Sequence, residues 1–461
     1  MKSRILKVLI ADYGMVFVLL FLCGLISVLT ISDIHPEDPR AGRRLAGLMV
    51  KKYGKDINVL VVARDIDADR KFAKAIQEEL TRLGANVVGT ELGDPYSVRQ
   101  RLEKIGAESV RVDLVATHNF SSKWKIFSGE TLKKLGANHP VLEKLKVVRP
   151  PSYRWPTFLT RQNLISILNQ NAPIAIMAIG MTLVIITAGI DLSVGSLMAL
   201  AAVVSAVCVQ EFLGAAQASG LSVMLAFFIA MVVCALSGVF AGVMITVFKM
   251  PPFVATLGLM MVARGASYIL AGGADALKIE ATSVGALYST SILGIPSQIV
   301  IMVALFILAH LVMSHTSFGR YVYAVGGNET AARLSGVPVV AVIIAVYAIC
   351  GLSAGLAGVL DASHFGTGRP KAGEFYELQV IAAVVVGGTS LMGGEGKMFG
   401  TFVGALILGV IQNGLNMAGV DSYRQMVIYG GLILVAVLID QLKKKVLKPA
   451  AGSPTGAAAA V

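Results

Sequence analysis

Charged side chains are scarce in this sequence. They make up 15% of its 461 residues, whereas about a quarter is usual in a soluble domain. Apolar residues make up 55%, and the mean hydropathy is +0.73. This balance excludes a disordered chain, a collagen and a small disulfide-stapled scaffold, and it predicts a membrane protein.

Cysteine is also rare, and all four cysteines lie in apolar segments, at Cys23, Cys208, Cys234 and Cys350. They suggest neither a disulfide framework nor a zinc site, so we expect no metal and no cofactor. A phosphate-binding loop is absent too, so we expect no ATP hydrolysis from this chain. We do not expect the chain to be an enzyme.

The charge that is present is concentrated in one stretch. Between Asp33 and Pro150 there are 22 basic and 16 acidic residues. The chain therefore joins a segment that could fold in water to one that could not. The predicted parts are a cytoplasmic N-terminus with a first transmembrane helix (1–32), a polar insert (33–150), a transmembrane core with nine helices (151–445) and a disordered cytoplasmic tail (446–461).

Ten apolar stretches approach the roughly 20 residues that a helix needs to cross a bilayer. They lie at about 13–31, 172–188, 192–212, 221–247, 252–272, 296–313, 338–360, 376–392, 398–417 and 425–440. Basic residues precede the first stretch and follow the last, so the positive-inside rule puts both termini in the cytoplasm. We expect an all-α polytopic membrane protein with about ten transmembrane helices and an extracytoplasmic insert between helices 1 and 2.

The insert is predicted to be a small α/β unit. β-branched runs at 57–62, 85–89 and 113–117 favour strands, and helical spacing covers 67–83 and 95–105. Strands that alternate with helices imply a parallel sheet.

Three alternating acids, Asp65, Asp67 and Asp69, lie where the first of these strands turns into a helix. They suggest a metal site, but acids at a helix N-terminus are favoured anyway by the helix dipole. We interpret them as solvated capping residues.

Small and polar residues recur inside the apolar spans. Glycines three or four residues apart, as in 351–358 and 400–404, are interpreted as helix packing faces. Polar residues are costly there unless they face a bundle interior, an aqueous path or a partner. Asp191 and Ser193 lie at a break between two spans, where Asp191 can cap the next helix or contact a solute.

Hydrogen bonding between helices and the lining of a pathway are both open for Arg264 and for the polar residues of the 398–417 span. The candidate pathway residues are Thr187, Asp191, Ser193, Gln412, Asn413 and Asn416.

Four motifs resemble the permease subunits of bacterial ATP-binding-cassette sugar importers, in the ribose-type branch. They are NLISILNQ at 163–170, MTLVIITAGIDLSVGS at 181–196, GRYVYAVGGNETAARLSG at 319–336 and AAVVVGGTSLMGGEGK at 382–397. The resemblance is close over 156–445 and loose over 1–32. It departs from the family at 33–150, because these permeases normally join their first two spans by a short outer segment.

The resemblance implies a monosaccharide permease of the bacterial cytoplasmic (inner) membrane that works by alternating access. It also implies a homodimer, two cytoplasmic ATPase subunits and an extracytoplasmic sugar-binding protein. In this family the cytoplasmic loop between the two halves carries a coupling helix that contacts the ATPase. The loop maps to about 327–336, and its candidate residues are Asn328, Glu329, Ala331, Ala332, Arg333, Leu334 and Gly336.

Other functions stay open from the sequence. Related permeases import nucleosides, autoinducers or branched-chain amino acids, and a membrane sensor could use the insert. A sensor would need a cytoplasmic output domain, and the tail is too short to form one. A net charge of +12 would suggest nucleic acid for a soluble protein, but here basic flanks of the spans contribute to it, and we expect no nucleic-acid partner.

Two roles are open for the insert. It is either a docking platform for the binding protein or an independently folded part without effect on transport. Its excess of bases over acids favours the docking role slightly, because it could steer an acidic partner.

Overall fold

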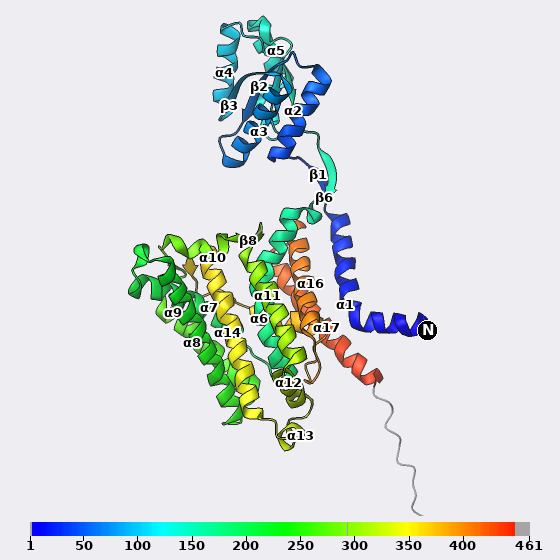
Figure 1. Ribbon diagram of the computed structural model, residues 1–461, viewed down its shortest axis with the longest axis vertical. Coiled ribbons are helices and arrows are strands. Elements are labelled where there is room, and N and C mark those ends of the chain that lie inside the picture. The colour runs from blue at the N-terminus through cyan, green and yellow to red at the C-terminus, as the bar shows by residue number, and fades with distance from the viewer. Residues whose placement is uncertain (1, 293, 448–461) are drawn as a thin grey trace, which may run out of the picture. The chain divides into compact units, whose positions relative to one another are not determined.

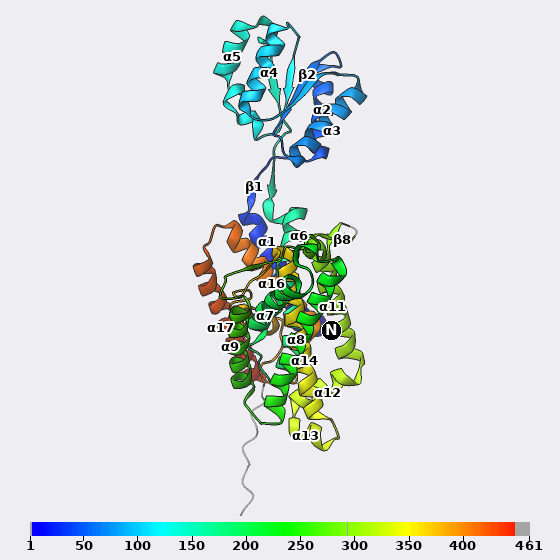
Figure 2. The same ribbon diagram turned by 90° about the vertical axis from the view of Figure 1, so that its left-hand side faces the viewer.

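The computed structural model describes residues 2–292 and 294–447, and the chain divides into two compact units (Figures 1 and 2). One unit comprises residues 31–157, and the other comprises residues 1–30 and 158–461. Each unit has its own buried apolar core. From residue 448 onward the expected tail lies outside the described residues.

The smaller unit is an α/β fold around a four-stranded sheet. Its elements are β1 (Ile31–Ile34), α2 (Pro39–Tyr53), β2 (Asn58–Ala63), α3 (Asp67–Leu83), β3 (Asn86–Leu92), α4 (Pro95–Ala107), β4 (Leu114–Ala116), α5 (Gly129–Asn138), β5 (Lys146–Val148) and β6 (Tyr153–Pro156). The strand order is β3-β2-β4-β5, and every neighbouring pair is parallel. The predicted parallel sheet is therefore confirmed.

Both faces of this sheet are covered by helices, which explains why β2 is apolar from Val59 to Ala63. Val59, Val61 and Ala63 pack in one cluster with α2 and α3, while Leu60 and Val62 pack in a second cluster with α4 and α5. Successive side chains of a strand point to opposite faces, so a strand buried on both sides is a continuous apolar run.

Five elements of this unit were not predicted: α2, α5, β5 and the paired strands β1 and β6. β5 has only three residues and one of them is charged, so it lacks the pattern of a strand. α2 does carry a helix start signal, because the Asp38 side chain accepts a hydrogen bond from the Ala41 N–H (2.9 Å) and Pro39 follows it.

The chain enters and leaves this unit through a two-stranded antiparallel ribbon. β1 pairs with β6, from Ile31 opposite Pro156 to Ile34 opposite Tyr153. The unit therefore extends beyond the expected bounds of 33–150, because the ribbon adds paired residues at both ends.

The larger unit is helical. Its helices are α1 (Lys2–Leu29), α6 (Arg161–Ile186), α7 (Val194–Val207), α8 (Gly220–Thr246), α9 (Pro252–Leu270), α10 (Ala286–Ser289), α11 (Ser297–His315), α12 (Ser317–Gly327), α13 (Glu329–Leu334), α14 (Val339–Phe365), α15 (Tyr376–Val386), α16 (Met398–Met417) and α17 (Ser422–Leu447). Short antiparallel pairs join β7 (Leu277–Lys278) to β10 (Thr367–Gly368) and β8 (Ser291–Ile292) to β9 (Ile295–Pro296).

In the described part of the chain, seven helices are long and apolar enough to cross a membrane: α6, α7 with its continuation to Phe212, α8, α9, α11, α14 and α16. Gly14–Leu29 of α1 and Tyr376–Val386 are shorter apolar helices. The last expected span, 425–440, lies in α17. The structure describes the helix but only part of its side chains.

The expected span 376–392 is wrong as one continuous helix. α15 ends at Val386, and the chain then runs without helix to Lys397. Gly388, Gly393 and Gly394 have φ values of 88°, 82° and 75°. A right-handed helix cannot continue through such left-handed residues, and glycine adopts them without strain.

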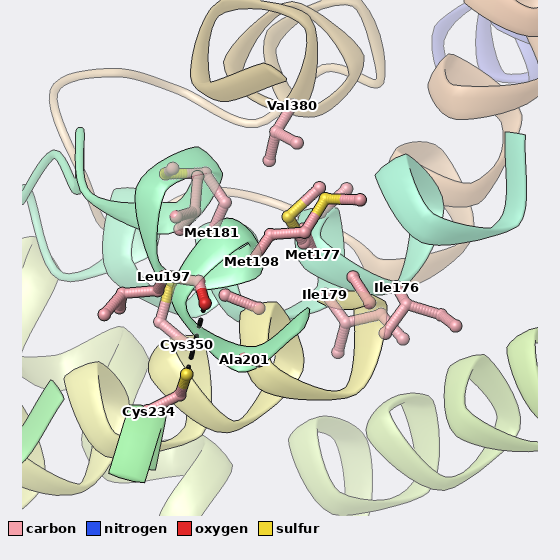
Figure 3. Packing of buried hydrophobic residues seen from close by; sticks show 14 of the residues in the cluster. Ile176, Met177, Ile179, Met181, Leu197, Met198, Ala201, Cys234, Cys350 and Val380 are labelled. Carbon is pink, nitrogen blue, oxygen red and sulfur yellow. Dashed lines mark hydrogen bonds between the residues drawn. The ribbon is translucent and has the colours of Figure 1, made fainter. Parts of the chain in front are cut away.

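α14 lies at the centre of the bundle, against α6, α7 and α8 (Figure 1). Its glycines permit this, because a Cβ on Gly351 would lie 2.2 Å from the Cys234 carbonyl oxygen and one on Gly358 would lie 2.2 Å from that of Met198. The predicted glycine packing faces are confirmed. Figure 3 shows this core, where the Cys234 thiol donates a hydrogen bond to the Leu197 carbonyl oxygen (3.2 Å). All four cysteines are free, as expected.

Candidate coupling and translocation site

The short helix predicted in the 327–336 loop is present as α13. The Asn328 side chain caps it by accepting a hydrogen bond from the Ala331 N–H (2.9 Å), and Glu329 pairs with Arg333 one turn later (2.8 Å). Only Ala332 is buried, while Leu334 is 85% exposed. The helix therefore presents a polar surface with one projecting apolar side chain.

Gly336 ends this helical turn with a φ of 82°, a conformation that favours glycine. The sequence-predicted residues 328–336 thus form one exposed, capped element of the described chain.

α12 ends in a glycine pair that connects α13 to the bundle. A Cβ on Gly326 would lie 1.7 Å from the Ile186 carbonyl oxygen and 2.7 Å from the Gly394 nitrogen. The Gly394 N–H donates a hydrogen bond to that same Ile186 oxygen (2.8 Å). The ends of α6 and α12 and the loop after α15 therefore meet through backbone atoms, where only glycine allows so close an approach.

The chain between α6 and α7 is the break that the sequence predicts, and it is strained at one residue. Ala188 has a left-handed φ of 60°. Asp191 and Ser193 are fully buried, and the Asp191 Oδ1 accepts hydrogen bonds from the Ser193 N–H (2.9 Å) and Oγ–H (2.6 Å). Asp191 thus holds a turn ahead of α7 instead of capping its first N–H groups. Thr187 donates to the Val184 carbonyl oxygen (2.8 Å).

A cavity of about 320 Å³ lies beside this break. It brings the break together with α13 and with residues of α8, α14 and the loop between α8 and α9. Its polar lining includes Thr187, Thr246, Lys249, Glu329, Arg333 and Tyr347. The bundle thus has a polar cavity that α13 itself helps to line.

Gly326, Lys249 and Tyr347 were missed by sequence reasoning. The sequence did contain a signal for two of them. Gly326 belongs to a glycine pair just before α13, and Lys249 is a lone lysine between two apolar spans. Tyr347 had none, because an aromatic residue in an apolar helix indicates only a core position.

Arg264 of α9 binds backbone and not another side chain. Its guanidinium donates hydrogen bonds to the carbonyl oxygens of Pro370 and Ala372 (2.8 Å to Ala372). These residues belong to the segment between α14 and α15, where Gly373 packs on the Gly195 backbone at the start of α7. Arg264 therefore fixes an irregular segment against the bundle. Of the two roles left open for Arg264 by the sequence, this contact agrees with hydrogen bonding.

The polar residues of α16 serve contacts between helices. Asn413 and Asn163 of α6 exchange two hydrogen bonds (2.8 and 3.0 Å), and the Asn416 Oδ1 accepts one from Gln425 of α17 (2.8 Å). Gln412 is half-buried. The structure does not bring these three residues to the cavity beside Thr187.

In the smaller unit, the three aspartates do not cluster, and no group of metal-ligating side chains occurs among the described residues. Asp65 pairs with Arg70 and Asp67 with Lys71 at the surface. Asp69 is different, because it is 1% exposed. The interpretation of Asp69 as a solvated capping residue is therefore wrong.

Asp69 accepts hydrogen bonds from the Arg64 Nε (2.7 Å) and interacts with the His118 Nε2 at 2.6 Å. Burial favours the neutral carboxyl, but the hydrogen bonds and charges of Arg64 and His118 outweigh it and hold the pKa of Asp69 below its usual value. The Ser121 N–H lies 3.3 Å from the His118 Nδ1. Both ring nitrogens are thus engaged, which makes this a buried structural cluster.

Comparison with known proteins assigns the larger unit. Residues 163–437 match the family described as branched-chain amino acid transport system, permease component. The chain is 44% identical over 292 residues to the ribose import permease protein RbsC of Escherichia coli, which covers 63% of this chain and 88% of the relative. It is 40% identical over 318 residues to RbsC of Bacillus subtilis, covering 68% and 94%.

The D-allose transport system permease protein AlsC of Escherichia coli is 34% identical over 292 residues, covering 62% of this chain and 86% of the relative. No solved structure gives a significant match. The matched region runs from within α6 past α16 and thus includes α13, the break and the cavity described above. The chain therefore belongs to the family of permease components described as the branched-chain amino acid transport system, and it is a multi-pass membrane protein of the ribose-permease type without catalytic function.

Proposed function

We propose that this chain is the membrane-spanning subunit of an ATP-driven importer for a ribose-like monosaccharide, in a bacterial cytoplasmic membrane. The observation that carries the proposal is the 44% identity to a ribose import permease over 88% of that relative's length. The small number of charged residues in the spans is consistent with an uncharged solute.

The working importer is a homodimer of this chain with two cytoplasmic ATPase subunits and an extracytoplasmic solute-binding subunit. Both termini lie in the cytoplasm and residues 33–150 lie outside, as the basic residues that flank the spans suggest. ATP hydrolysis resides in the ATPase subunits.

In this proposal α13 is the helix that the ATPase subunit contacts. Its exposure, its cap and the projecting Leu334 suit a groove in another protein. Movement of α13 would reach the end of α6 through Gly326, whose backbone touches Ile186. The break at 187–193 would then change shape, and the cavity beside Thr187 would open or close toward the cytoplasm.

Solute uptake by the complete importer tests the proposal. The chain is reconstituted into proteoliposomes with the ATPase and solute-binding subunits, and ATP-dependent uptake of labelled ribose is measured. We expect uptake that unlabelled ribose suppresses and that leucine and a nucleoside leave unchanged. ATP-dependent uptake of leucine or the nucleoside in place of ribose would show that the sugar assignment is wrong.

The coupling role of α13 is tested separately. Replacing residues 329–333 with glycine removes the helix and changes only Ala332 among the buried core residues. We expect loss of sugar-stimulated ATP hydrolysis with a dimer that still folds. The matched control replaces residues 215–218, in the connection between α7 and α8, with four glycines. Normal stimulation in the 329–333 variant would mean that the ATPase subunit binds elsewhere.

A further inference from the structure

Helix α2 carries nearly all of the net positive charge of the smaller unit. Residues 33–150 contain 22 bases and 16 acids, an excess of six. α2 contains five bases and no acid, so it supplies five of these six charges. In α3, four bases are matched by four acids. The charge of this unit is thus localised on one helix.

The bases of α2 are also unpaired. None of the five lies within 4 Å of an acid in the described part of the chain, whereas every base of α3 does, namely Arg70, Lys71, Lys74 and Arg82. Unpaired like charges repel one another and leave a strong positive potential over the helix. Only Lys51 and Lys52, in the last turn, are favoured by the helix dipole, so an acidic partner would stabilise Arg40, Arg43 and Arg44 most.

The five bases share one side of α2. The opposite side packs into the core through Leu45, Ala46 and Met49. The outward side, here called the α2 face, consists of Arg40, Arg43, Arg44, Gly47, Leu48, Lys51 and Lys52, which recur at helical spacing. At its centre Leu48 is 42% exposed. An apolar centre with a polar rim is found in protein interfaces.

A cavity of about 200 Å³ adjoins the first turn of α2. Arg40 and Arg44, one turn apart, line it together with Pro36 and Asp38. Pro150, Pro151 and Tyr153, from the C-terminal end of the smaller unit, line its other side. Two guanidinium groups can hold a carboxylate through paired hydrogen bonds. Arginine and tyrosine around a small cavity are also the residues that most often anchor a protein partner.

We propose that the α2 face and this cavity form the docking surface for an acidic protein, the extracytoplasmic solute-binding subunit of the importer. This inference rests on the function proposed above. Acidic side chains of the subunit meet the five bases, and one of its carboxylates enters the cavity between Arg40 and Arg44. The charge of α2 accelerates the encounter, and Leu48 with the cavity fixes the orientation.

A protein accounts for these features better than a lipid surface does. A helix that binds lipid inserts its apolar side into the bilayer, but the apolar side of α2 is buried in the core of the unit. A flat array of headgroups would also make no use of a cavity lined by arginine and tyrosine.

The test is a titration of the solute-binding subunit against the complete importer in nanodiscs. Both direct binding and stimulated ATP hydrolysis are measured, at low and high salt. The α2 variant combines Arg40→Gln, Arg43→Gln and Arg44→Gln. The matched control combines Lys71→Gln, Lys74→Gln and Arg82→Gln, which removes the same charge from α3.

We expect the half-maximal concentration of the subunit to rise about tenfold in the α2 variant at low salt, and less than about twofold in the control. At about 0.5 M salt, where the Debye length is only a few ångström, the difference should shrink. An equal rise in both variants, or no rise in the α2 variant, would overturn the proposal. Loss of the effect in nanodiscs without anionic lipid would assign the face to the membrane and overturn it as well.

A second variant does not depend on removing arginine. A Cβ on Gly47 meets open space, so Gly47→Glu places an acid in the middle of the α2 face without disturbing the fold. It should raise the half-maximal concentration too. Wild-type protein that binds the subunit without stimulated hydrolysis would refute the proposed function and leave the docking surface standing. Wild-type protein that does not bind the subunit would refute the docking surface.

Discussion

Asp69 is an acid with almost no exposure to solvent, and its two partners decide its charge. Arg64 and His118 hold it ionised in the core of the smaller unit. An ion pair of this kind is strongly destabilising when one partner is removed, because the other is left uncompensated.

We expect Asp69→Asn to lower the free energy of unfolding of this unit by roughly 3 kcal/mol, at the low end of the range because Arg64 keeps part of its exposure. Both tryptophans, Trp124 and Trp155, lie in this unit, so urea unfolding of the full chain followed by tryptophan fluorescence reports it selectively. Asp65→Asn, at an exposed ion pair, is the control and should change the unfolding midpoint little.

The pH dependence follows from the same group. The pKa of Asp69 is lower in the folded unit than in the unfolded chain, so the stability that it contributes is complete above the unfolded pKa, near 3.9. This contribution is lost as the pH falls through the lowered, folded pKa. Wild-type protein should therefore lose stability on acidification, and the Asp69→Asn variant should show less of this loss. Parallel acid curves for the two proteins would contradict this account.

Gly326 allows the backbone of α12 to approach the end of α6 closely. We expect Gly326→Ala to abolish or strongly reduce transport, because its Cβ cannot be placed 1.7 Å from the Ile186 carbonyl oxygen without separating α12 from α6. Gly327→Ala is the matched control, since a Cβ there meets open space. Uptake in proteoliposomes measures both, and equal uptake would show that this contact is not needed.

The sequence predicted the contacts and the burial of individual residues less well than it predicted the helices and strands. It indicated that Asp191 and Ser193 lie at a break, but not that they bond each other. It also treated Asp69 like its neighbours Asp65 and Asp67. Burial depends on which residues the fold brings together from distant parts of the chain, and His118, which is 49 residues away in the sequence, approaches Asp69 only in the folded sheet.

At the scale of elements, local pattern predicted most helices and strands. β2, α3, β3, α4 and β4 follow their apolar periodicity, and α13 follows its polar start and its terminal glycine. α15 was predicted too long, because residues 387–392 carry no charge and could extend an apolar helix, but the chain turns at Gly388, whose φ is left-handed. Hydropathy alone does not distinguish the two.

The segment between α14 and α15 depends on one side chain for two of its carbonyl hydrogen bonds. We expect Arg264→Met to loosen it, because Pro370 and Ala372 lose a charged donor worth about 1.5–3 kcal/mol for each bond. Limited trypsin digestion measures this at Lys371, which lies in the segment, whereas the bond after Arg369 precedes Pro370 and resists trypsin. Arg264→Lys keeps a cation and should show a smaller increase in cleavage. Unchanged cleavage in both variants would mean that other contacts hold the segment.

At the scale of the whole molecule, the property to be measured is the side of the membrane on which residues 33–150 and the C-terminus lie. Protease added to the outside of spheroplasts should cut within residues 33–150 and leave a tag at the C-terminus intact, because the basic flanks favour a cytoplasmic C-terminus. Cleavage of the tag with protection of residues 33–150 would invert the assignment. Permeabilised cells, in which both should be cut, serve as the control.

Because β1 and β6 pair, the chain enters and leaves the smaller unit at adjacent positions, so the unit can be removed without changing the rest of the chain's path. Residues directly opposite in an antiparallel pair lie about 5 Å apart, so Ile34 and Tyr153 are separated by the distance that a two-residue hairpin turn spans. An Asn-Gly turn in place of residues 35–152 would close the chain without stretching either neighbouring helix. The same geometry means that an ancestral permease with a tight hairpin at this point could have received the whole unit in one insertion, with its membrane helices left in register.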